Sequence, residues 1–495
     1  MTDYYVRTDG SNSNDGLTNS SDGAFLTIQY AVDNVSGSGD VINVIGPGTF
    51  AEEVEKRNDG DNITILGVGD PVVEHITIRE DDDCTIDSMK FASSSTSLEG
   101  GVWLHTANNT TVTNCTFTDM ACAAIFGLGN TGQRSNNCTI TNNTITGCQA
   151  GIVCYGDTSG GGWLINNNSI SDITFRNSQT FTDCDACRVL SGDDHVFTNN
   201  LIFGNTLENV FGKFWGTHTG GTHSTVMTDS TLVLATQPTS AYVGATIKNL
   251  TDGSQGTITA ASGTTITCSG GLSGGTNNEW QTNDEWATSN FPHLDGLQVF
   301  TQGVADDVYN LTVTNNYITL VGTAFQIENQ NGGNGNFVYR NNVCHTGLEN
   351  KYNEKPVGNG PISASDLDQG TNYFEFNTFH NWGVRAVFTG CSGIRFNDNI
   401  CNDVDSSGYV FNTETDSSAD YNITWPDASP DAGANDINSD PLFVDESDIL
   451  GADGIFFTDD DGLHLGVGSP GIGAASNSLN IGAYQSTERY RARQL

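Results

Sequence analysis

The stretch Thr139-Ile140-Thr141-Asn142-Asn143-Thr144-Ile145 decides the fold, because close copies of it recur along the chain. Each copy joins two short aliphatic segments through a turn that contains asparagine. Neighbouring copies are typically about 25 to 30 residues apart, which is a solenoid spacing. The other copies begin at Leu164, Val196, Leu311, Phe337 and Ile394.

The alternation within these segments sends every second side chain to one face, so stacked copies share an interior. Asparagine tolerates the left-handed backbone conformation that bends the chain between two strands. Asparagines at equivalent turns can also stack in hydrogen-bonded ladders. The pattern therefore predicts an all-β protein, a right-handed parallel β-helix. We expect each rung to contain a strand, an Asn turn, a strand, a loop and a strand.

The start of the chain predicts a cap for this solenoid. Phe25, Ile28, Ala31 and Val32 follow one another at helical spacing, so we expect a short amphipathic helix over 25–36. A helix across the end of a stack of strands covers an otherwise open apolar edge.

One region interrupts the repeats with short strands and Gly or Asp turns, at intervals of about 8 to 12 residues, which predicts a small antiparallel barrel or sandwich. The expected organisation has five parts. These are a cap with the first rungs over 1–60, solenoid over 61–223, the inserted module over 224–288, solenoid with a C-terminal cap over 289–485, and a basic tail over 486–495.

The composition is strongly acidic, with 59 Asp and Glu against 18 Lys and Arg and a formal charge of -41. Such a field repels nucleic acid and anionic membranes, so we expect neither as a partner. No stretch of the sequence approaches the apolar length of a membrane span. Met1–Val6 lacks the basic start and apolar run of a signal peptide. We therefore expect a virion-associated protein, an extracellular protein exported by a non-classical route, or otherwise a cytoplasmic one.

The twelve cysteines are scattered along the chain. Cys184 and Cys187 form a C-x-x-C pair, but no second pair completes a zinc site. We expect buried free thiols rather than a redox or metal role.

The two ends of the chain resemble those of pectate-lyase-like right-handed β-helix proteins. The residues that carry the resemblance are Tyr4-Tyr5-Val6 and Thr27-Ile28-Gln29 at the start, and Ser469-Pro470-Gly471-Ile472 and Ile481-Gly482-Ala483-Tyr484 at the end. The insert resembles small β modules of bacteriophage structural proteins. The superfamily includes polysaccharide lyases, glycoside hydrolases, sugar epimerases and phage tailspikes. The resemblance therefore implies a carbohydrate ligand without defining the reaction.

Three stretches read as stacked copies of one strand: Asp185–Val189, Asp295–Val299 and Thr323–Glu328. Alignment by their inward residues places the outward residues in files along the solenoid. The files are Asp185 over Asp295, then Arg188 over Gln298 over Gln326, and Leu190 over Phe300 over Glu328.

These files suit the cleavage of an acidic glycan by β-elimination. Neighbouring rungs lie about 4.8 Å apart, so Asp185 and Asp295 can hold a calcium ion or share a proton. In a lyase the ion would bridge both carboxylates and a uronate, and Arg188 or His293 would remove the C5 proton. The two stacked glutamines would orient the sugar. An arginine base needs a strongly lowered pKa, which makes His293 the chemically easier choice.

Other interpretations of the same residues stay open. A hydrolase would use Asp295 and Glu328 (or Asp185) as acid and base, and the gap between their carboxylates would decide the stereochemistry. Arg188 over an aspartate is also typical of a surface ion pair, and the glutamines of a solvated amide ladder. His293 also suits a simple turn residue.

Four further residues are candidates for contacts with substrate: Lys213, Trp215, His218 and His345. The aromatic residues around Lys213 suit either stacking on sugar rings or covering of the core. The two histidines are equally typical of loops and strand ends.

Three classes of function follow from the sequence. The first is a polysaccharide-degrading enzyme, most plausibly a lyase. The second is a virion-attached tailspike or fibre that binds or cleaves a host-surface glycan, which implies a homotrimer or a place in a virion. The third is a solenoid that binds glycan without cleaving it.

Overall fold

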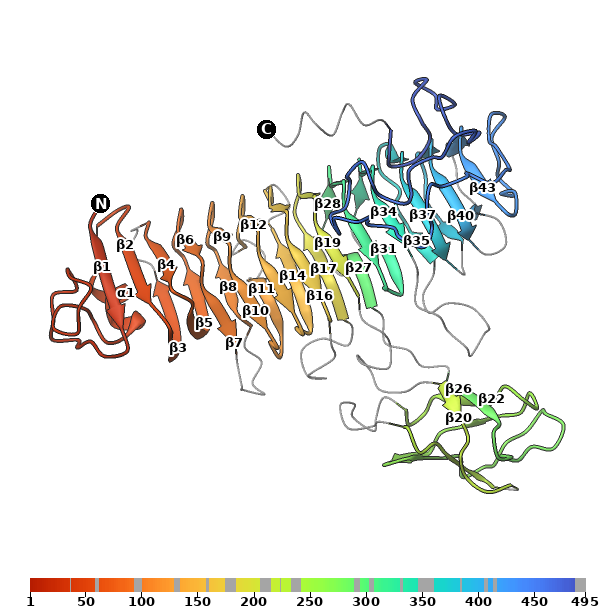
Figure 1. Cartoon of the computed structure of the whole chain (residues 1–495), viewed down its shortest axis with the longest axis horizontal. Helices are drawn as coiled ribbons and strands as arrows, with labels where there is room; N and C mark the ends of the chain where they lie inside the picture. Colours follow the sequence, from red (N-terminus) through yellow and green to blue (C-terminus); the bar gives the residue numbers. More distant parts are fainter. Residues whose placement is uncertain are drawn as a thin grey trace.

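The computed structural model forms one long solenoid with a smaller module beside it (Figure 1). It describes residues 1–35, 37–57, 62–92, 100–128, 134–156, 160–173, 184–204, 215–222, 224–232, 242–288, 294–301, 307–329, 333–345, 360–382, 385–404, 408–412 and 416–485.

One long side of the solenoid is a 13-stranded sheet in which neighbouring strands are parallel. Its strands, in order, are β1 Asp3–Arg7, β2 Val41–Ile45, β4 Thr64–Val68, β6 Thr85–Asp87, β9 Thr111–Thr113, β12 Thr139–Thr141, β15 Leu164–Asn166, β18 Val196–Thr198, β29 Thr312–Thr314, β33 Val338–Arg340, β36 Asn372–Glu375, β39 Ile394–Asn397 and β42 Ser418–Asp420.

The rest of the wall is a 21-stranded parallel sheet made of two rows. Two long strands, β3 Gly48–Arg57 and β5 Pro71–Arg79, begin both rows. The first row then follows the Asn turns: β7 Lys90–Ala92, β10 Thr116–Thr118, β13 Thr144–Thr146, β16 Ser169–Ser171, β19 Leu201–Phe203, β30 Tyr317–Thr319, β34 Val343–His345, β37 Thr378–Trp382, β40 Ile400–Val404 and β43 Ile423–Trp425. The second row is β8 Val102–His105, β11 Ala123–Leu128, β14 Ala150–Tyr155, β17 Cys184–Ser191, β27 Leu294–Thr301, β31 Thr323–Asn329, β35 Gly360–Ser365, β38 Ala386–Thr389 and β41 Tyr409–Asn412.

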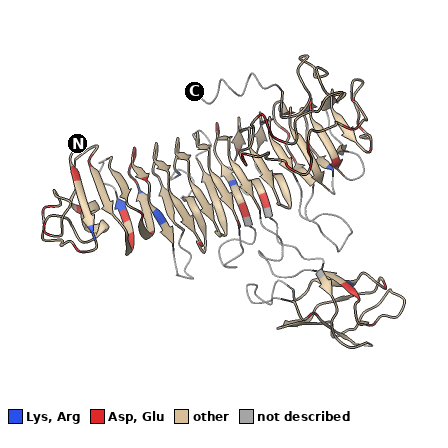
Figure 2. Ribbon diagram, in the orientation of Figure 1, with Lys and Arg blue, Asp and Glu red and all other residues tan. Residues whose placement is uncertain are grey.

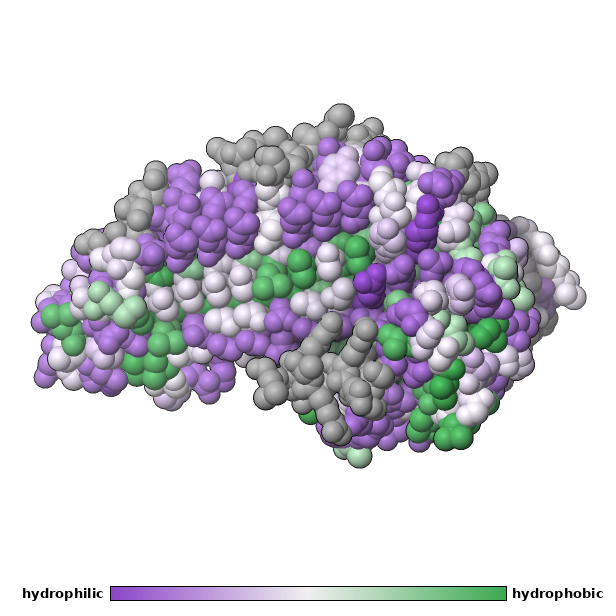
Figure 3. Space-filling model, turned by 90° about the horizontal axis from the view of Figure 1, so that it is seen from above, coloured by the Kyte–Doolittle hydropathy of each residue, from purple (hydrophilic) through white to green (hydrophobic). Residues whose placement is uncertain are grey.

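Equivalent side chains of successive rungs stack inside and outside the wall. In the 13-stranded sheet the middle residue of each short strand is buried while its flanking residues are not. The paired middle residues Ile140 and Ile165 illustrate this, since both are fully buried. Burial of one such side chain contributes about 1.5–3 kcal/mol. Figure 3 shows bands of similar hydropathy running along the molecule, as stacked files require.

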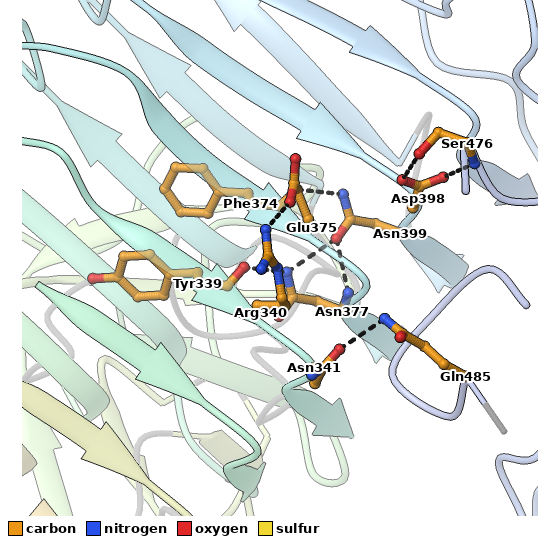
Figure 4. Close-up of polar contacts among 10 residues, drawn as sticks. All are labelled: Tyr339, Arg340, Asn341, Phe374, Glu375, Asn377, Asp398, Asn399, Ser476 and Gln485. Atoms are coloured by element: carbon orange, nitrogen blue, oxygen red, sulfur yellow. Dashed lines mark hydrogen bonds and ion pairs between the residues drawn. The ribbon is translucent and has the colours of Figure 1, made fainter. Parts of the chain in front are cut away.

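An asparagine ladder joins the rungs at the turn before the first row. In each step the backbone N–H and the Nδ2 of one asparagine donate to the Oδ1 of the next, as Asn200 does to Asn316 at 3.0 Å. The members are Asn143, Asn168, Asn200, Asn316, Asn342, Asn377, Asn399 and Asn422. The residue before each one has a positive φ near 57°, for example Asn142 with 57°. The predicted turns and ladder are confirmed, and Figure 4 shows two of the members.

Both ends of the solenoid are capped. The expected N-terminal helix is confirmed as α1 Ile28–Asn34, whose first backbone N–H groups donate to the carboxylate of Glu52. At the other end, Asp436 accepts from Asn422 and so terminates the ladder.

The C-terminal segment folds back over the outer face of the first row (Figure 1). Ser476 donates to Asp398, and Gln485 donates to Asn341 at 3.0 Å (Figure 4). The backbone N–H of Ala483 donates to Thr378. From β19 onward, this face of the wall is therefore covered by the chain itself.

The inserted module is antiparallel, as expected, but it starts earlier than residue 224. Its first strand pairs with its last, so the module begins at Trp215. Its larger sheet contains β20 Trp215–Thr217, β26 Glu285–Thr288, β22 Thr246–Asn249 and β23 Gln255–Thr257, and its smaller sheet β21 Val226–Thr228, β25 Thr265–Thr267 and β24 Ala260–Ser262. Two tryptophans, Trp280 and Trp286, are fully buried in its core.

The remaining expectations concern thiols and membrane spans. All eleven cysteines whose side chains the structure describes are buried and outside disulfides, which confirms the expected buried thiols for them. Across the described residues, no helix is long and apolar enough to cross a membrane.

Candidate functional site

Long connections gather at one corner of the solenoid, between the first and second rows. The connections over 172–183, 204–293 and 346–359 leave β16, β19 and β34, which belong to three of four neighbouring rungs. Other rungs turn this corner within a few residues, as at 147–149 and 320–322. Insertions on a rigid scaffold commonly carry function, so this corner is where a site is expected.

The register predicted for this corner is confirmed. Asp185 pairs with Asp295, and Arg188, Gln298 and Gln326 pair in succession across β17, β27 and β31. The third predicted file is confirmed in part, by the pair Phe300 and Glu328.

An irregularity in each strand explains how these residues share the outer face. Ala186 and Cys187 are consecutive, yet both belong to the apolar core. Two inward residues in a row place the residues on either side of them outside. The equivalent position on β27 is Gly296, where a Cβ would lie 2.8 Å from both Ile318 and the carbonyl oxygen of Ala324.

The polar residues of the site are buried rather than solvated. Asp185 and Asp295 are each 1% exposed, and Arg188 is 7% exposed. Burial of charged groups is costly unless they are paired or bind a ligand. The interpretation of Arg188 as an ordinary surface ion pair is therefore wrong.

The contacts of the site form two groups. Arg188 Nε lies 3.3 Å from Asp185 Oδ2, and its guanidinium carbon lies 5.4 Å from the ring centre of Phe300. Gln326 Nε2 donates to Glu328 Oε1 at 2.5 Å. The side-chain oxygens of Gln298 and Gln326 are buried and have no hydrogen-bond partner among the described residues. Both oxygens are therefore buried acceptors whose hydrogen-bonding capacity the described residues do not use.

The same outward file continues toward the N-terminal end through the fully buried Val153 to two aromatic residues. Arg188 pairs with Val153, which pairs with Phe126, which pairs with Trp103. Trp103 and Phe126 are partly exposed, and their rings lie 6.2 Å apart in edge contact. The file therefore changes from apolar to polar at β17, beside the long connections.

Figure 2 shows the same concentration of charge, with one blue and two red stretches on β17 and β27 in the otherwise mostly uncharged middle of the solenoid. Stacked carboxylates beside a guanidinium can bind a carboxylate-bearing ligand, hold a cation or move a proton.

Calcium takes six to eight oxygen ligands. No cluster of three or more metal-ligating side chains occurs in the part of the chain that the structure describes. Calcium at Asp185 and Asp295 stays a prediction and would need further oxygen atoms from a ligand.

The comparisons with known proteins agree with this architecture. Residues 19–230 match a family model described as a right handed beta helix region. The solenoid is a right-handed parallel β-helix. No curated protein matches the chain.

Solved structures with similar folds include a XylC complex with xylose, with 11% identity, a TM-score of 0.45 and coverage of 90% of this chain and 88% of that one. An exopolygalacturonase from Thermotoga maritima has 10% identity and a TM-score of 0.39, over 78% of this chain and 84% of that one. A rhamnogalacturonan lyase has 12% identity and a TM-score of 0.34, over 94% and 97%. These similarities are too remote to define a reaction.

The other predicted site residues of the β-helix have different outcomes. Lys213 and His293 lie outside the described residues, as does the side chain of Trp215. His218 belongs to the core of the inserted module: it is fully buried, its Nδ1 accepts from Thr228 and its Nε2 contacts the carbonyl of Gly221. The prediction that His218 contacts substrate is therefore wrong. His345 lies at the corner with the long connections, at the end of β34.

Sequence reasoning missed Trp103 and Phe126, although both are outward residues of second-row strands. Their signal is weak in the sequence, because second-row strands such as β8 and β11 do not follow the Asn turn that marks the first row. Only the pairing of β11 with β14 and of β14 with β17 places them in the file of Arg188.

Proposed function

We propose that this β-helix binds an acidic, uronate-containing polysaccharide along the outer face of the second row and cleaves it by β-elimination. The observation that carries the proposal is the in-register stack at the corner of long connections. Asp185 lies beside Asp295 there, and Arg188 beside the stacked pair Gln298 and Gln326, with the charged members buried.

Arg188 is suited to binding the uronate carboxylate. Its guanidinium lies beside Asp185, and a guanidinium binds carboxylates with matched, bidentate geometry. Such pairing stabilises the negative charge that develops when the C5 proton is removed. Arg188 is then an electrostatic group rather than the base, which favours His293 as the base.

In the proposed step, the bonds that break and form are all in the sugar, and protons move to and from the base. The base takes the C5 proton, a C4–C5 double bond forms, and the bond from C4 to the glycosidic oxygen breaks. The leaving oxygen takes a proton from the protonated base or from water. Asp185 and Asp295 are the residues that would hold a calcium ion, which would add positive charge beside the uronate carboxylate. Gln298 and Gln326 accept hydrogen bonds from sugar hydroxyls through their buried oxygens.

The alternative is a glycoside hydrolase, and geometry limits which carboxylates it would use. Asp295 pairs with Thr323, five positions before Glu328 on β31. At about 3.3 Å per residue this offset is about 16–17 Å. Catalytic carboxyl groups of glycosidases lie about 5–9.5 Å apart, so Asp295 and Glu328 do not suit that role. Asp185 and Asp295 on neighbouring rungs do.

The test is turnover of a panel of uronate polymers, including polygalacturonate and alginate. A lyase produces the ultraviolet absorbance of the C4–C5 double bond, whereas a hydrolase produces reducing ends without it. Arg188→Ala should abolish turnover, and Arg395→Ala should not. Arg395 is the matched control because it pairs with Asp416 at the exposed surface of the 13-stranded sheet. Reducing ends without absorbance would establish the hydrolase, and neither signal would contradict both.

Two arms extend this test. Loss of turnover in EDTA that calcium alone restores would support the calcium prediction, and unchanged turnover would contradict it. The mass of the native protein in solution tests the predicted homotrimer. Detection of this chain in purified virus particles tests the predicted association with a virion.

A further inference from the structure

Three basic side chains, here called the basic file, occupy equivalent outward positions at the N-terminal end of the second row. Arg57 on β3 pairs with Arg79 on β5, which pairs with His105 on β8. Like charges directly opposite one another on neighbouring strands are destabilising. Acids outnumber Lys and Arg by 59 to 18 in this chain, yet Arg57 lies opposite another arginine. Such a costly arrangement is expected where a ligand supplies negative charge.

The acids around the two arginines neutralise them only in part. Arg79 Nε donates to Glu55 Oε1 at 2.6 Å. Arg57 is exposed, and no residue in the described part of the chain forms an ion pair with it. Glu80 follows the end of β5 and is also exposed. Two guanidinium groups therefore lie beside one bound carboxylate.

The third member of the basic file is a neutral histidine that presents a donor. Arg79 Nη1 lies 3.2 Å from His105 Nδ1. A guanidinium only donates, so Nδ1 accepts and the ring proton lies on Nε2. Burial, followed by the charge of Arg79, lowers the pKa of His105, in agreement with a neutral ring. His105 is partly exposed, and its Nε2–H is a hydrogen-bond donor.

An aromatic ring lies beside the basic file. Trp103 precedes His105 by two residues on β8, and both face outward because Val102 and Leu104 are buried in the core. Trp103 is partly exposed and pairs with Thr77, two residues before Arg79 on the neighbouring strand. An aromatic ring can stack on a sugar, and a guanidinium beside it can bind the carboxylate of that sugar.

The basic file lies on the path of the proposed substrate but far from the cleaved bond. From β17, which carries Arg188, the second row runs through β14, β11 and β8 to β5. These four rung spacings amount to about 19 Å. A glycan bound at Arg188 therefore reaches the basic file only if it is several sugars long.

We propose that the basic file binds the carboxylate of a second uronate, about four rungs from the site of cleavage. This inference rests on the proposed function, because it assigns a further subsite to the same polymer. Three neighbouring groups that donate hydrogen bonds suit an anion, and Trp103 stacks on the sugar that carries it. The chemistry selects for glycans in which uronates recur along the chain over glycans with isolated uronates.

Binding is tested by calorimetric titration with galacturonate and alginate oligomers, each as a disaccharide and as a long oligomer. All proteins carry Asp295→Asn, so that cleavage does not contribute heat. Arg57→Ala should weaken binding of the responsive long oligomer about 5- to 30-fold, which corresponds to about 1–2 kcal/mol, as expected for a lost charge-assisted contact. Disaccharide binding should not change.

Lys90→Ala is the charge-matched control. Lys90 lies at the same end of the solenoid, but on the first row, where it pairs with Asp70 at 3.1 Å. Its removal should leave binding of the long oligomer unchanged. An equal weakening by both variants would show that only the net charge of the protein matters, which would overturn the subsite.

Two further variants test the sign of the charge effect. Glu55→Gln retains an oxygen that accepts from Arg79 but removes a negative charge, so it should tighten binding of the long oligomer about 2- to 5-fold. Arg57→Lys retains the charge and should bind more tightly than Arg57→Ala. Oligomers whose carboxylates have been reduced to alcohols should be insensitive to Arg57→Ala. Equal weakening for reduced and natural oligomers would overturn the carboxylate contact.

The outcomes separate this subsite from the proposed function. If Arg57→Ala binds long oligomers as tightly as its parent while the natural protein cleaves them, the subsite is wrong and cleavage stands. If long oligomers bind in the expected way but the natural protein cleaves none, the subsite stands and cleavage is wrong. Absence of binding to every uronate oligomer would overturn both.

Discussion

The outer faces of the 13-stranded sheet and of the second row are built on the same repeat but carry different chemistry. On the former, outward positions of β12 and β29 are short and uncharged: Thr139, Thr141, Thr312 and Thr314. On the second row the outward file changes from apolar residues, two of them aromatic, to buried polar ones at Arg188. The threonine files show that the fold needs no buried charge on its outer face. Charges that are costly and structurally unnecessary are expected at functional sites.

The largest expected effect concerns the buried charges on the outer face of the second row. Asp295→Asn should lower kcat by roughly 10²–10³-fold, as does loss of other preorganised electrostatic groups. Its fold should persist, because the side chain lies outside the core. Circular dichroism checks the fold, and initial rates on the responsive uronate polymer check the activity.

Thr312→Ala is the matched change on the other face. It should alter neither rate nor fold. Equal rates for the Asp295 and Thr312 variants would mean that the buried charge has no role in cleavage.

The turns offer a second comparison, between the two residues of one asparagine pair. Asn200→Ala removes two donor and two acceptor contacts of the ladder, to Asn316, Asn168 and the carbonyl of Ile165. We expect a loss of about 2–4 kcal/mol in the free energy of unfolding, since unsatisfied buried partners remain. The shift of the urea midpoint measures it.

Asn199→Gly is the control for this loss. Asn199 has a φ of 56° and an exposed side chain, and glycine adopts that backbone conformation without strain. A midpoint that moves as far as that of Asn200→Ala would show that the ladder itself contributes little.

A third effect concerns acid stability. Burial lowers the pKa of His195 to about 4, whereas an unfolded histidine titrates near 6.5. Below about pH 6.5 the unfolded chain gains a proton that the folded chain does not bind until near pH 4. The stabilisation is therefore fully present above pH 6.5 and is lost as the pH falls toward 4, by up to about 3 kcal/mol.

Urea unfolding at several pH values between 7 and 4 measures this loss. His195→Gln provides the comparison, because glutamine can still accept from Trp163 and donate to Ser191, the two contacts of the ring, but does not titrate. Identical pH slopes for the two proteins would exclude His195 as the source.

Much of the β-helix fold and part of the candidate site were predictable from the sequence. The period, the alternation and the left-handed preference of asparagine are local properties, and they led to the rungs, the ladder and the pairing of Asp185 with Asp295. Burial of those carboxylates was not predictable, because it depends on what packs over a face. Glu446 meets His380 only because the C-terminal segment folds back over the first row, which no local pattern encodes.

The inserted module shows the same limit. Its alternation predicted an antiparallel fold correctly. Its start at Trp215 was missed because the pairing of β20 with β26 joins the two ends of the module and is therefore non-local. For the same reason His218 was predicted to contact substrate, although it lies in the core of the module.

The smallest expected effect concerns the aromatic residues of the second row and the binding of long substrates. Trp103 and Phe126 lie about two to three rungs, or about 10–14 Å, from Arg188 along one file. A partly exposed aromatic ring on that path can stack on a sugar at a distance from the cleaved bond, for a gain of about 0.5–1.5 kcal/mol. Trp103→Ala should therefore raise KM about 2- to 10-fold for long polymers. It should leave KM for disaccharides unchanged, because two sugar units do not reach from Arg188 to Trp103. Thr139→Ala, on the opposite face, should change neither value. An equal increase in KM for short and long substrates would indicate that Trp103 supports the wall of the solenoid rather than binding the glycan.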